Sequence, residues 1–450
     1  MFKKILIANR GEIAVRIIRA CRNLGIRSVA VYSKEDERSL HVQLADQRIC
    51  IGEGPTRNSY LNMERILAAA QNMDVDAIHP GFGFLSENSK FVSLCEKHNI
   101  TFIGPPSTII ESMGNKSQAK KTMIEAGVLA VPGSKEPMHD VEVALEEAKK
   151  VGFPIMIKAS AGGGGKGMRL ARTKEEFEAQ FNIAQRESAN AFADDTMYLE
   201  RFIENPRHIE VQIIGDTFGN IVALGERDCS IQRNHQKLVE ESPSPNISEE
   251  TREQMNQAAL KAAKAVNYVN AGTIEFIMDK DDKFYFMEMN TRIQVEHGVT
   301  EMVTGTDLII EQIRVAMGEK LSFAKEDVML RGHAIECRIN AEIPEKNFMP
   351  CPGEVKHIHL PAGNGIRVDT YLYEGCTIPS EYDSMIAKVI VHAPTREAAI
   401  QKMSSALDEM VILGVETNLN FQYQIMKIPA FCQGKVDTGF LAKEMNIGDE

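Results

Sequence analysis

The most specific pattern in this 450-residue chain is the stretch Glu288-Met289-Asn290-Thr291-Arg292-Ile293-Gln294-Val295-Glu296-His297. Successive side chains of an extended segment point to opposite faces, so every second residue shares a face. A plain solvated sheet face is the alternative interpretation, but such a face is usually filled with lysine and threonine. The pattern therefore favours a functional row of glutamates, amides and an arginine: Glu288, Asn290, Arg292, Gln294 and Glu296.

A second carboxylate is expected beside this row. Glu275 lies in the alternating segment Thr273-Ile274-Glu275-Phe276, and the polar residues 279–282 separate this segment from the row as a turn would. A hairpin around that turn would bring Glu275 next to Glu288. Mg²⁺ binds hard oxygen ligands and completes its shell with water and phosphate. The two carboxylates and the amide oxygen of Asn290 therefore suit a magnesium site.

A glycine run lies between two expected strands. Residues 162–165 are four successive glycines, and Lys158 ends the strand before them. The backbone amides of such a run approach a phosphate chain closely because no side chain intervenes. The run is not a P-loop, since Lys166 is followed by Gly167 rather than by serine or threonine. Flexible turns also contain glycine runs, and it is the pairing with Lys158 that favours phosphate binding.

Composition narrows the class of protein. Lysine and arginine total 51 and aspartate and glutamate total 63, so the net charge is −12. This charge makes nucleic acid or an anionic membrane surface a poor partner. No apolar run reaches the length of a membrane-spanning helix. The eight cysteines are scattered, without a Cys-x-x-Cys pair, which argues against a disulfide framework or a zinc site and favours a cytoplasmic location.

The order of expected elements changes twice along the chain. In the first hundred-odd residues strands and helices alternate, which predicts an α/β fold with a doubly wound parallel sheet. From about Met113 onward, mostly antiparallel strands and an amphipathic helix over residues 249–266 predict an α+β unit. A third section begins near Arg331. The absence of a long proline- or serine-rich linker predicts closely packed domains.

Several motifs are ambiguous when taken alone. Glu200-Arg201-Phe202-Ile203 follows an expected strand and is typical either of any strand end or of a hinge that offers backbone groups to adenine. His208 alternates with apolar neighbours, and a lone histidine there is most often structural. Residues 232–237 form a polar, basic loop, which solvent exposure explains equally well. In residues 331–340 three polar side chains share one face: Glu336, Arg338 and Asn340.

Together these motifs resemble the biotin carboxylase family over nearly the whole chain. The resemblance rests on seven separated stretches that follow the family's order, which makes a chance match negligible. The stretches are residues 7–14, 79–88, 158–167, 226–230, 232–237, 288–297 and 331–340.

The resemblance implies three domains and an ATP site. It implies a Rossmann-like N-terminal domain over residues 1–112, an ATP-grasp domain with a glycine-rich lid over residues 113–330, and a mixed C-terminal biotin carboxylase domain over residues 331–446. The metal is Mg²⁺ or Mn²⁺, on the same three ligands that the residues alone suggested. The implied phosphate lid consists of Gly163, Gly164 and Gly165. The other implied ATP-binding residues are Lys116, Lys158, Glu200, Arg201, Phe202, Ile203, His208, Gln232, His235, Glu275 and Glu288.

The implied reaction is ATP- and bicarbonate-dependent carboxylation of biotin through carboxyphosphate. Glu296 would remove the bicarbonate proton, and Lys237 would stabilise the transferring phosphoryl group. Arg292 would hold the planar carbonate with its forked donors. Arg338 would stabilise the enolate-like oxygen of biotin. The implied bicarbonate contacts are Lys237, Arg292, Gln294, Val295 and Arg338, and the implied biotin contacts are Phe82 and Arg338.

The resemblance also implies partners. Biotin would arrive on a separate biotin carboxyl carrier protein, because the chain has no Ala-Met-Lys-Met attachment motif and no room for a carboxyltransferase. The resemblance implies a free-standing subunit that forms a homodimer and passes the carboxyl group to carboxyltransferase subunits for acetyl-CoA in fatty acid synthesis. A split propionyl-CoA or pyruvate carboxylase is the alternative system.

Other classes of function are also possible. Another ATP-grasp ligase would share the glycine run and the magnesium site, but it would not need Arg338 or the pairing of Arg292 with Glu296. A regulatory nucleotide-binding protein that has lost activity would not keep these residues intact. A dehydrogenase is excluded because Asn9-Arg10-Gly11-Glu12 lacks the further glycines of a dinucleotide fingerprint.

The chain departs from the family pattern in places. Gly298 stands where proline is usual, and it is expected to loosen the turn that aims Glu296. Phe82 replaces a frequent tyrosine and loses a hydroxyl group near the expected biotin pocket. Neither change removes a catalytic group.

Overall fold

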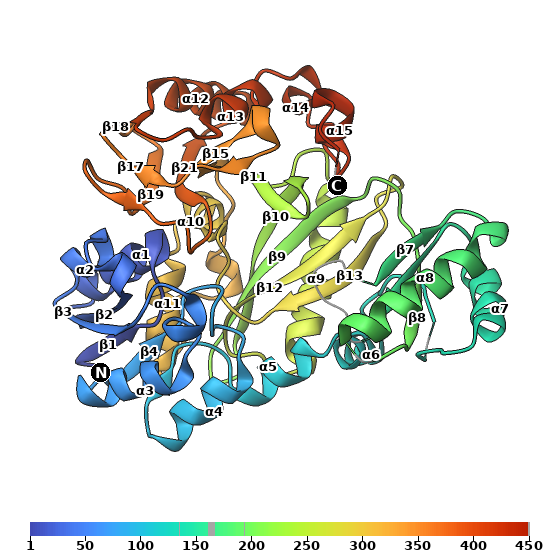
Figure 1. The fold of residues 1–450 in the computed structure, drawn as a ribbon, viewed down its shortest axis with the longest axis horizontal. Coiled ribbons are helices and arrows are strands. Elements are labelled where there is room, and N and C mark those ends of the chain that lie inside the picture. The colour runs from blue at the N-terminus through green and yellow to red at the C-terminus, as the bar shows by residue number, and fades with distance from the viewer. Residues whose placement is uncertain (135, 161–166, 193, 449–450) are drawn as a thin grey trace.

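The computed structural model describes residues 1–134, 136–160, 167–192 and 194–448, which form a large body with a smaller lobe at one side (Figure 1). The N-terminal part lies at the lower left of the body, the C-terminal part lies above it, and the lobe projects to the right. Within these described ranges, no helix is both long and apolar enough to cross a membrane.

The N-terminal part is the parallel sheet that its alternating pattern predicted. The strand order is β3-β2-β1-β4-β5, and β1 pairs in parallel with both β2 and β4. Apolar clusters cover both faces of β1, as in other doubly wound sheets. The elements are β1 (Lys4–Ile7), α1 (Gly11–Asn23), β2 (Arg27–Ser33), α2 (Leu40–Leu44), β3 (Gln47–Gly52), α3 (Met63–Asn72), β4 (Ala77–His79), α4 (Ser89–Lys97), β5 (Thr101–Phe102) and α5 (Ser107–Gly114).

An eight-stranded antiparallel sheet forms the centre of the body. Its order is β13-β12-β9-β10-β11-β14-β21-β19. Because β11 pairs with β14, the sheet continues without a break past the expected domain boundary near residue 330. Its first five strands and the helices beside them are α6 (Lys116–Glu125), β9 (Arg207–Gly215), β10 (Ile221–Arg233), β11 (Gln236–Ser242), α9 (Glu249–Ala265), β12 (Asn270–Met278), β13 (Phe284–Asn290), α10 (His297–Thr304) and α11 (Leu308–Ala316).

The C-terminal part completes this sheet and adds smaller ones. Helix α12 packs against β21 and β14 around a large apolar cluster. The elements are β14 (His333–Asn340), β15 (Glu342–Ile343), β16 (Met349–Pro350), β17 (Gly353–Glu354), β18 (His357–His359), β19 (Ile366–Thr370), β20 (Thr377–Ile378), β21 (Met385–Ala393), α12 (Arg396–Glu409), β22 (Val411–Leu413), α13 (Leu419–Ile425), α14 (Pro429–Cys432) and α15 (Phe440–Met445).

The lobe is a three-stranded antiparallel sheet, in the order β7-β6-β8, covered by two helices. Phe177 and Phe181 fill its separate apolar core. The expected phosphate lid at Gly163, Gly164 and Gly165 follows β6 and lies outside the described residues. The elements are α7 (Val141–Val151), β6 (Ile155–Ala159), β7 (Met168–Ala171), α8 (Lys174–Phe192) and β8 (Met197–Arg201).

The structure corrects three expectations. The extended segment expected through Glu296 stops at Asn290, and residues 291–296 turn into α10. The expected loop at residues 232–237 is a tight hairpin, because Asn234 and His235 take the left-handed backbone that such turns use. Gly298 does not loosen a turn. It is buried inside α10, where an added Cβ would lie 2.4 Å from Cδ1 of Ile390, so close packing favours glycine.

A buried arginine of the N-terminal part pairs with an aspartate and contacts two tyrosines of the C-terminal part. Arg10 donates from Nε and Nη2 to Asp36 over 2.8 and 2.9 Å. The same guanidinium lies 4.3 Å from the ring centre of Tyr382 and 5.2 Å from that of Tyr371. Both tyrosines belong to the C-terminal part, and a cation over an aromatic face is attracted to it. Arg10 therefore binds across the boundary between the two parts.

We predict that Arg10→Ala weakens this junction. The substitution leaves the charge of Asp36 buried and unpaired, which costs about 3–5 kcal/mol. Urea unfolding followed by tyrosine fluorescence should show an earlier first transition. Lys34→Ala is the matched control, because Lys34 pairs with Glu53 in solvent over a similar distance, and it should leave that transition in place. An unchanged midpoint in Arg10→Ala would contradict the role of Arg10.

The same pair predicts a dependence on pH. Burial alone would raise the pKa of Asp36, but Arg10 outweighs burial and lowers the pKa from 3.8 to about 2. A carboxyl group with a depressed folded-state pKa stabilises the fold above its unfolded pKa, and this contribution is lost as pH falls through the folded value, here between about pH 4 and about pH 2. Urea midpoints of Asp36→Asn should change less over this window than those of the unmodified protein. Parallel curves would refute the assignment.

Candidate functional site

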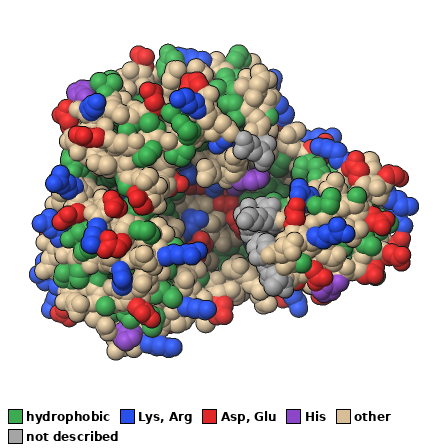
Figure 2. Space-filling view, in the orientation of Figure 1, with side chains coloured by type: hydrophobic (Ala, Val, Ile, Leu, Met, Phe, Trp, Pro, Cys, Tyr) green, Lys and Arg blue, Asp and Glu red, His purple; other side chains and the backbone are tan. Residues whose placement is uncertain are grey.

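The surface is hollowed between the body and the lobe, and side chains of lysine, arginine, acidic residues and histidine lie in the hollow (Figure 2). The strands of the eight-stranded sheet carry seven of the predicted site residues: His208, Gln232, Lys237, Glu275, Glu288, Asn290 and Arg338. The lobe supplies Lys158 and Glu200 from β6 and β8. Two of the predicted ATP-binding residues pair between α6 and β13, because the ammonium of Lys116 lies 3.5 Å from a carboxylate oxygen of Glu288.

Lys237 is the centre of the site. Its ammonium donates to Glu210 over 2.6 Å, to Glu275 over 3.1 Å and to Glu296 over 2.6 Å. The register of the sheet makes this possible, since Glu210 on β9 lies directly opposite Glu275 on β12. Lys237 lies near the start of β11, two strands away from β9. Its side chain extends toward both of these glutamates. The structure thus brings together a predicted catalytic lysine, a predicted base and a predicted metal ligand.

Arg338 approaches the same base from the other side. From β14 its Nη2 donates to Oε2 of Glu296 over 3.0 Å, and its Nε donates to Glu240 over 2.5 Å. Lys237 binds the other oxygen, Oε1, of Glu296. The two cations therefore fix the carboxylate plane of Glu296. Glu240 fixes the guanidinium plane of Arg338 in turn.

The surroundings keep Glu296 ionised. Burial alone would raise its pKa, but the charges of Lys237, Arg338 and Arg227 outweigh burial and hold the pKa well below 4.5. Glu240 differs, because burial raises its pKa to about 7 although Arg338 opposes the shift. The site therefore contains an ionised carboxylate, Glu296, beside a carboxyl group, Glu240, whose pKa is raised to about 7.

The three predicted metal ligands are neighbours on one hairpin. Glu275 and Glu288 are cross-strand partners of β12 and β13, as the alternation predicted, and Asn290 lies at the end of β13. The amide nitrogen of Asn290 donates to Glu275 over 2.8 Å, and its oxygen accepts from Arg292. Glu288 is half-exposed at the hollow. This set of carboxylate and amide oxygens fits the preference of Mg²⁺ for hard ligands.

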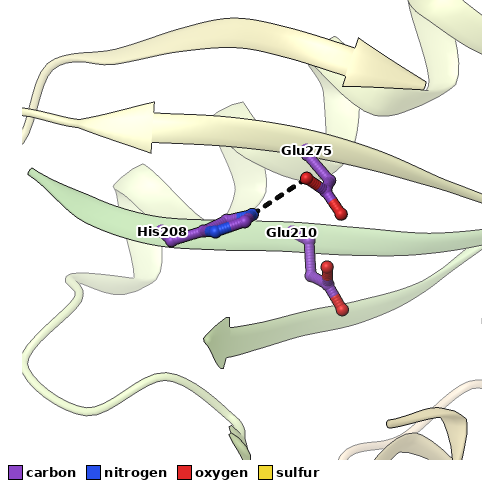
Figure 3. A group of neighbouring side chains, drawn as sticks. All are labelled: His208, Glu210 and Glu275. Carbon is purple, nitrogen blue, oxygen red and sulfur yellow. Dashed lines mark hydrogen bonds and ion pairs between the residues drawn. The ribbon is translucent and has the colours of Figure 1, made fainter. Parts of the chain in front are cut away.

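His208 joins the site beside Glu210 and Glu275 (Figure 3). Its Nε2 lies 3.0 Å from Oε2 of Glu275, and the amide of Gln232 lies 3.4 Å from its Nδ1. A histidine with two carboxylates is a possible metal group, but Glu210 already binds Arg227 and Lys237. The three residues in Figure 3 therefore belong to a larger ion-pair network, in which His208 and Lys237 position Glu275.

The loop after β13 holds the remaining polar residues of the motif. Arg292 donates from Nε to Glu87 over 2.9 Å, and Gln294 donates to Glu275 over 2.7 Å. The carbonyl of Val295 accepts a bond of 2.5 Å from Lys388. Because the strand has ended, the side chains of Arg292 and Gln294 are oriented by these hydrogen bonds and not by strand alternation.

The predicted ATP contacts of the lobe form a separate group. Glu200 binds Lys120 over 2.9 Å and also binds Lys158. Burial alone would raise the pKa of Glu200, but the two lysines lower it to about 2. His235 is exposed at the tip of the β10–β11 hairpin, and Arg201, Phe202 and Ile203 follow at the end of β8.

Phe82 is half-buried, and its carbonyl accepts a hydrogen bond from Asn9. It packs against an apolar cluster that combines residues of the N-terminal sheet with residues of the central part, such as Ile293 and Leu308. Its place in the predicted biotin pocket stays a prediction.

Sequence reasoning missed several side chains that hold the site together. Glu210 lies in an alternating polar segment with His208, but the sequence offered no means to identify its partner. Arg227 is fully buried and donates to Glu210, Gln212, Thr273, Gln294 and Thr300. These contacts depend on the register of distant strands. The other missed residues are Glu87, Lys120, Glu240 and Lys388.

Family models match three successive segments of the chain. Residues 1–110 match the biotin carboxylase N-terminal domain, and residues 336–443 match the biotin carboxylase C-terminal domain. Residues 115–324 match the ATP binding domain of the carbamoyl-phosphate synthase L chain.

Curated relatives are similar over nearly their whole length. The chain is 55% identical to the biotin carboxylase of Nostoc sp., with 99% of each chain covered. It is 57% identical to biotin carboxylase 1 of Bacillus subtilis, with 98% of each chain covered.

Solved structures agree with these relatives. A biotin carboxylase–beta-gamma-ATP complex from Campylobacter jejuni superimposes with a TM-score of 0.94 at 48% identity, covering 99% of both chains. The biotin carboxylase domain dimer of Hydrogenobacter thermophilus 2-oxoglutarate carboxylase, in complex with MgADP, ADP and bicarbonate, gives a TM-score of 0.93 at 49% identity, covering 100% of this chain and 99% of that one. With its three domains in order and its cation-flanked carboxylate in place, the chain belongs to the biotin carboxylase family.

Proposed function

We propose that this chain carboxylates biotin with ATP and bicarbonate, as the first half-reaction of acetyl-CoA carboxylase. The observation that carries the proposal is the buried carboxylate of Glu296, with Lys237 on one oxygen and Arg338 on the other. A proton acceptor between two cations suits a reaction in which one anion, bicarbonate, attacks another, the terminal phosphate of ATP. The relatives bound to MgADP and bicarbonate support the same chemistry.

ATP binds in the hollow between the lobe and the sheet in this proposal. Lys116 now pairs with Glu288, and Lys158 pairs with Glu200. In this proposal the two lysines bind the phosphates of ATP. His208 and Gln232 lie deeper on the sheet and contact the nucleotide there. The adenine lies against the hinge at residues 200–203. The proposed domains are residues 1–112, 113–330 and 331–446.

Glu275, Glu288 and Asn290 would hold Mg²⁺ or Mn²⁺, which screens the phosphate charges when bound. The short bonds of Asn290 and Gln294 to Glu275 orient its carboxylate for this role.

Bicarbonate is activated by Glu296. Arg292 donates from its three nitrogens to Glu87, to the carbonyl of Ile293 and to Asn290, and the second N–H groups of Nη1 and Nη2 hold the carbonate, with Gln294 and Val295 beside it. Glu296 accepts the bicarbonate proton as the oxygen attacks phosphorus. Lys237 turns from Glu296 toward the phosphoryl oxygens. Its bonds to Glu210 and Glu275 keep the ammonium in place while it turns.

Biotin is carboxylated beside Arg338. The resulting carboxyphosphate releases CO₂, and the phosphate removes the proton from N1 of biotin, which then attacks CO₂. Arg338 stabilises the negative charge that develops on the ureido oxygen. Because Glu240 binds its Nε, Arg338 keeps a fixed orientation while the charge forms.

The partners follow from the half-reaction. We propose a separate biotin carboxyl carrier protein, carboxyltransferase subunits that accept the carboxyl group for acetyl-CoA, and a homodimer like the relative crystallised as one. The eight cysteines are all free thiols, which supports a cytoplasmic location. Transfer from the carboxylated carrier to acetyl-CoA, propionyl-CoA and pyruvate, each with its carboxyltransferase, tests the acceptor. Transfer to pyruvate alone would reject acetyl-CoA.

We predict that Glu296→Gln abolishes bicarbonate-dependent ATP cleavage. The amide keeps the shape but cannot accept the proton, so ADP release in the presence of biotin should fall by about 10²–10⁴-fold. Affinity for ATP, measured by calorimetry, should change little. Glu409→Gln is the control, because Glu409 pairs only at the surface with His359. Full turnover by Glu296→Gln would reject Glu296 as the base.

We predict that Arg338→Lys separates the two steps. Lysine keeps the charge but cannot bind Glu240 and Glu296 with one planar fork. Carboxylation of free biotin, measured with labelled bicarbonate, should fall at least about 10²-fold. The slow cleavage of ATP that needs bicarbonate but not biotin should persist. Equal loss of both activities would show that Arg338 acts before biotin does.

A further inference from the structure

Lys388 is a fully buried lysine that the reaction above does not use. It lies on β21, directly opposite Arg338 of β14. Its ammonium donates a hydrogen bond of 2.5 Å to the carbonyl of Val295. That carbonyl belongs to the peptide group that joins Val295 to Glu296. The lysine therefore binds the backbone immediately before the base.

Three carboxyl groups surround this ammonium at longer distances. Glu12 lies 3.5 Å away, and Glu336 and Asp369 each lie 3.9 Å away. Within the described residues, both carboxyl oxygens of Glu12 and of Glu336 lack a hydrogen-bond partner. The carbonyl of Val295 is thus the nearest oxygen to the ammonium, and the three carboxyl groups lie farther away.

The charge of Lys388 is maintained by these neighbours. Burial alone would lower its pKa, but Glu12, Glu336 and Asp369 outweigh burial and raise it. A charged ammonium is a stronger donor to a carbonyl than a neutral amine. The bond to Val295 is therefore charge-assisted.

The neighbours of Lys388 come from separate parts of the chain. Glu12 lies at the start of α1 in the N-terminal part, and Val295 lies in the loop after β13. Glu336 and Asp369 lie on β14 and β19, the two strands that flank β21. The side chain of Glu296 is held by Lys237 and Arg338, and its backbone is held by Lys388. The base is thus fixed at both ends.

We propose that Lys388 is a positioning residue for Glu296, which it holds by its backbone so that the carboxylate meets bicarbonate at the right distance. This inference rests on the proposed function, because it assigns Lys388 to the proton-transfer step of that reaction. An apolar side chain of similar length would fill the same space without the cost of burying a charge. The bond to the loop explains why an ammonium lies there.

The test is Lys388→Met, which keeps the length of the side chain and removes the bond to Val295. A misplacement of about 1 Å at a reacting group costs about 10²-fold in rate. We expect kcat/KM for bicarbonate to fall about 10–10²-fold, with the dissociation constant for MgATP within twofold. A purely structural role would instead lower the melting temperature and leave the kinetics of the folded enzyme unchanged.

Lys402→Met is the matched control. Lys402 also donates to backbone carbonyls of the C-terminal part, to Asn364 over 2.9 Å and to His392 over 2.6 Å. These carbonyls lie away from the loop after β13. Kinetic constants for bicarbonate should stay within twofold of the unmodified protein.

Lys388→Arg is a second variant that separates loss of the bond to Val295 from loss of the buried charge, because it keeps a cation among the three carboxyl groups. Its donors lie at a different reach and cannot reproduce the bond to Val295, so the melting temperature should recover while kcat/KM for bicarbonate stays low. If both variants fold and keep kcat/KM for bicarbonate within twofold, the proposal is wrong. If the unmodified protein shows no bicarbonate-dependent turnover, the proposed function itself fails.

Discussion

The ammonium of Lys237, enclosed by three carboxylates, is the interaction on which the rest of the site depends. Glu210, Glu275 and Glu296 come from β9, β12 and the loop after β13, and neither of these two strands pairs with β11. Three buried negative charges would repel one another strongly without a cation between them. Lys237 therefore decides whether the acidic residues can converge, and the sheet register only places them within its reach.

The pairing of buried carboxyl groups with cations continues from Lys237 to helix α1 of the N-terminal part. Lys237 and Arg338 bind Glu296 from opposite sides. Lys388 lies beside Arg338 on the neighbouring strand. Carboxyl groups outnumber cations in this row, and burial raises the pKa of Glu12 and of Glu240 to about 7. Protonation of these groups offsets the excess negative charge. A row of acidic and basic side chains thus connects the N-terminal helix to the proposed metal ligands.

The sequence predicted the parts of this arrangement that local pattern controls. Strand alternation correctly placed Glu275 opposite Glu288, and the strand–helix rhythm gave the parallel first sheet. It failed where contacts between distant segments decide the structure. The row through Glu296 was expected on one strand face, but the strand ends at Asn290. Glu210, Glu240 and Lys388 were missed because charged residues in strands give no sign of their partners until the register is known.

The break in the strand has a physical consequence for the chemistry. A side chain on a strand is aimed by the backbone pleat and keeps its direction whether or not neighbouring domains are attached. Glu296 follows a turn instead, so its direction depends on Lys237, Arg338 and the bond from Lys388 to Val295. These groups lie on strands from both sides of the expected domain boundary. A carboxyphosphate intermediate reacts with water, so activation of bicarbonate is useful only in an assembled site that excludes it. If Glu296 is the base, as proposed, contacts between domains orient it only when that assembly is complete.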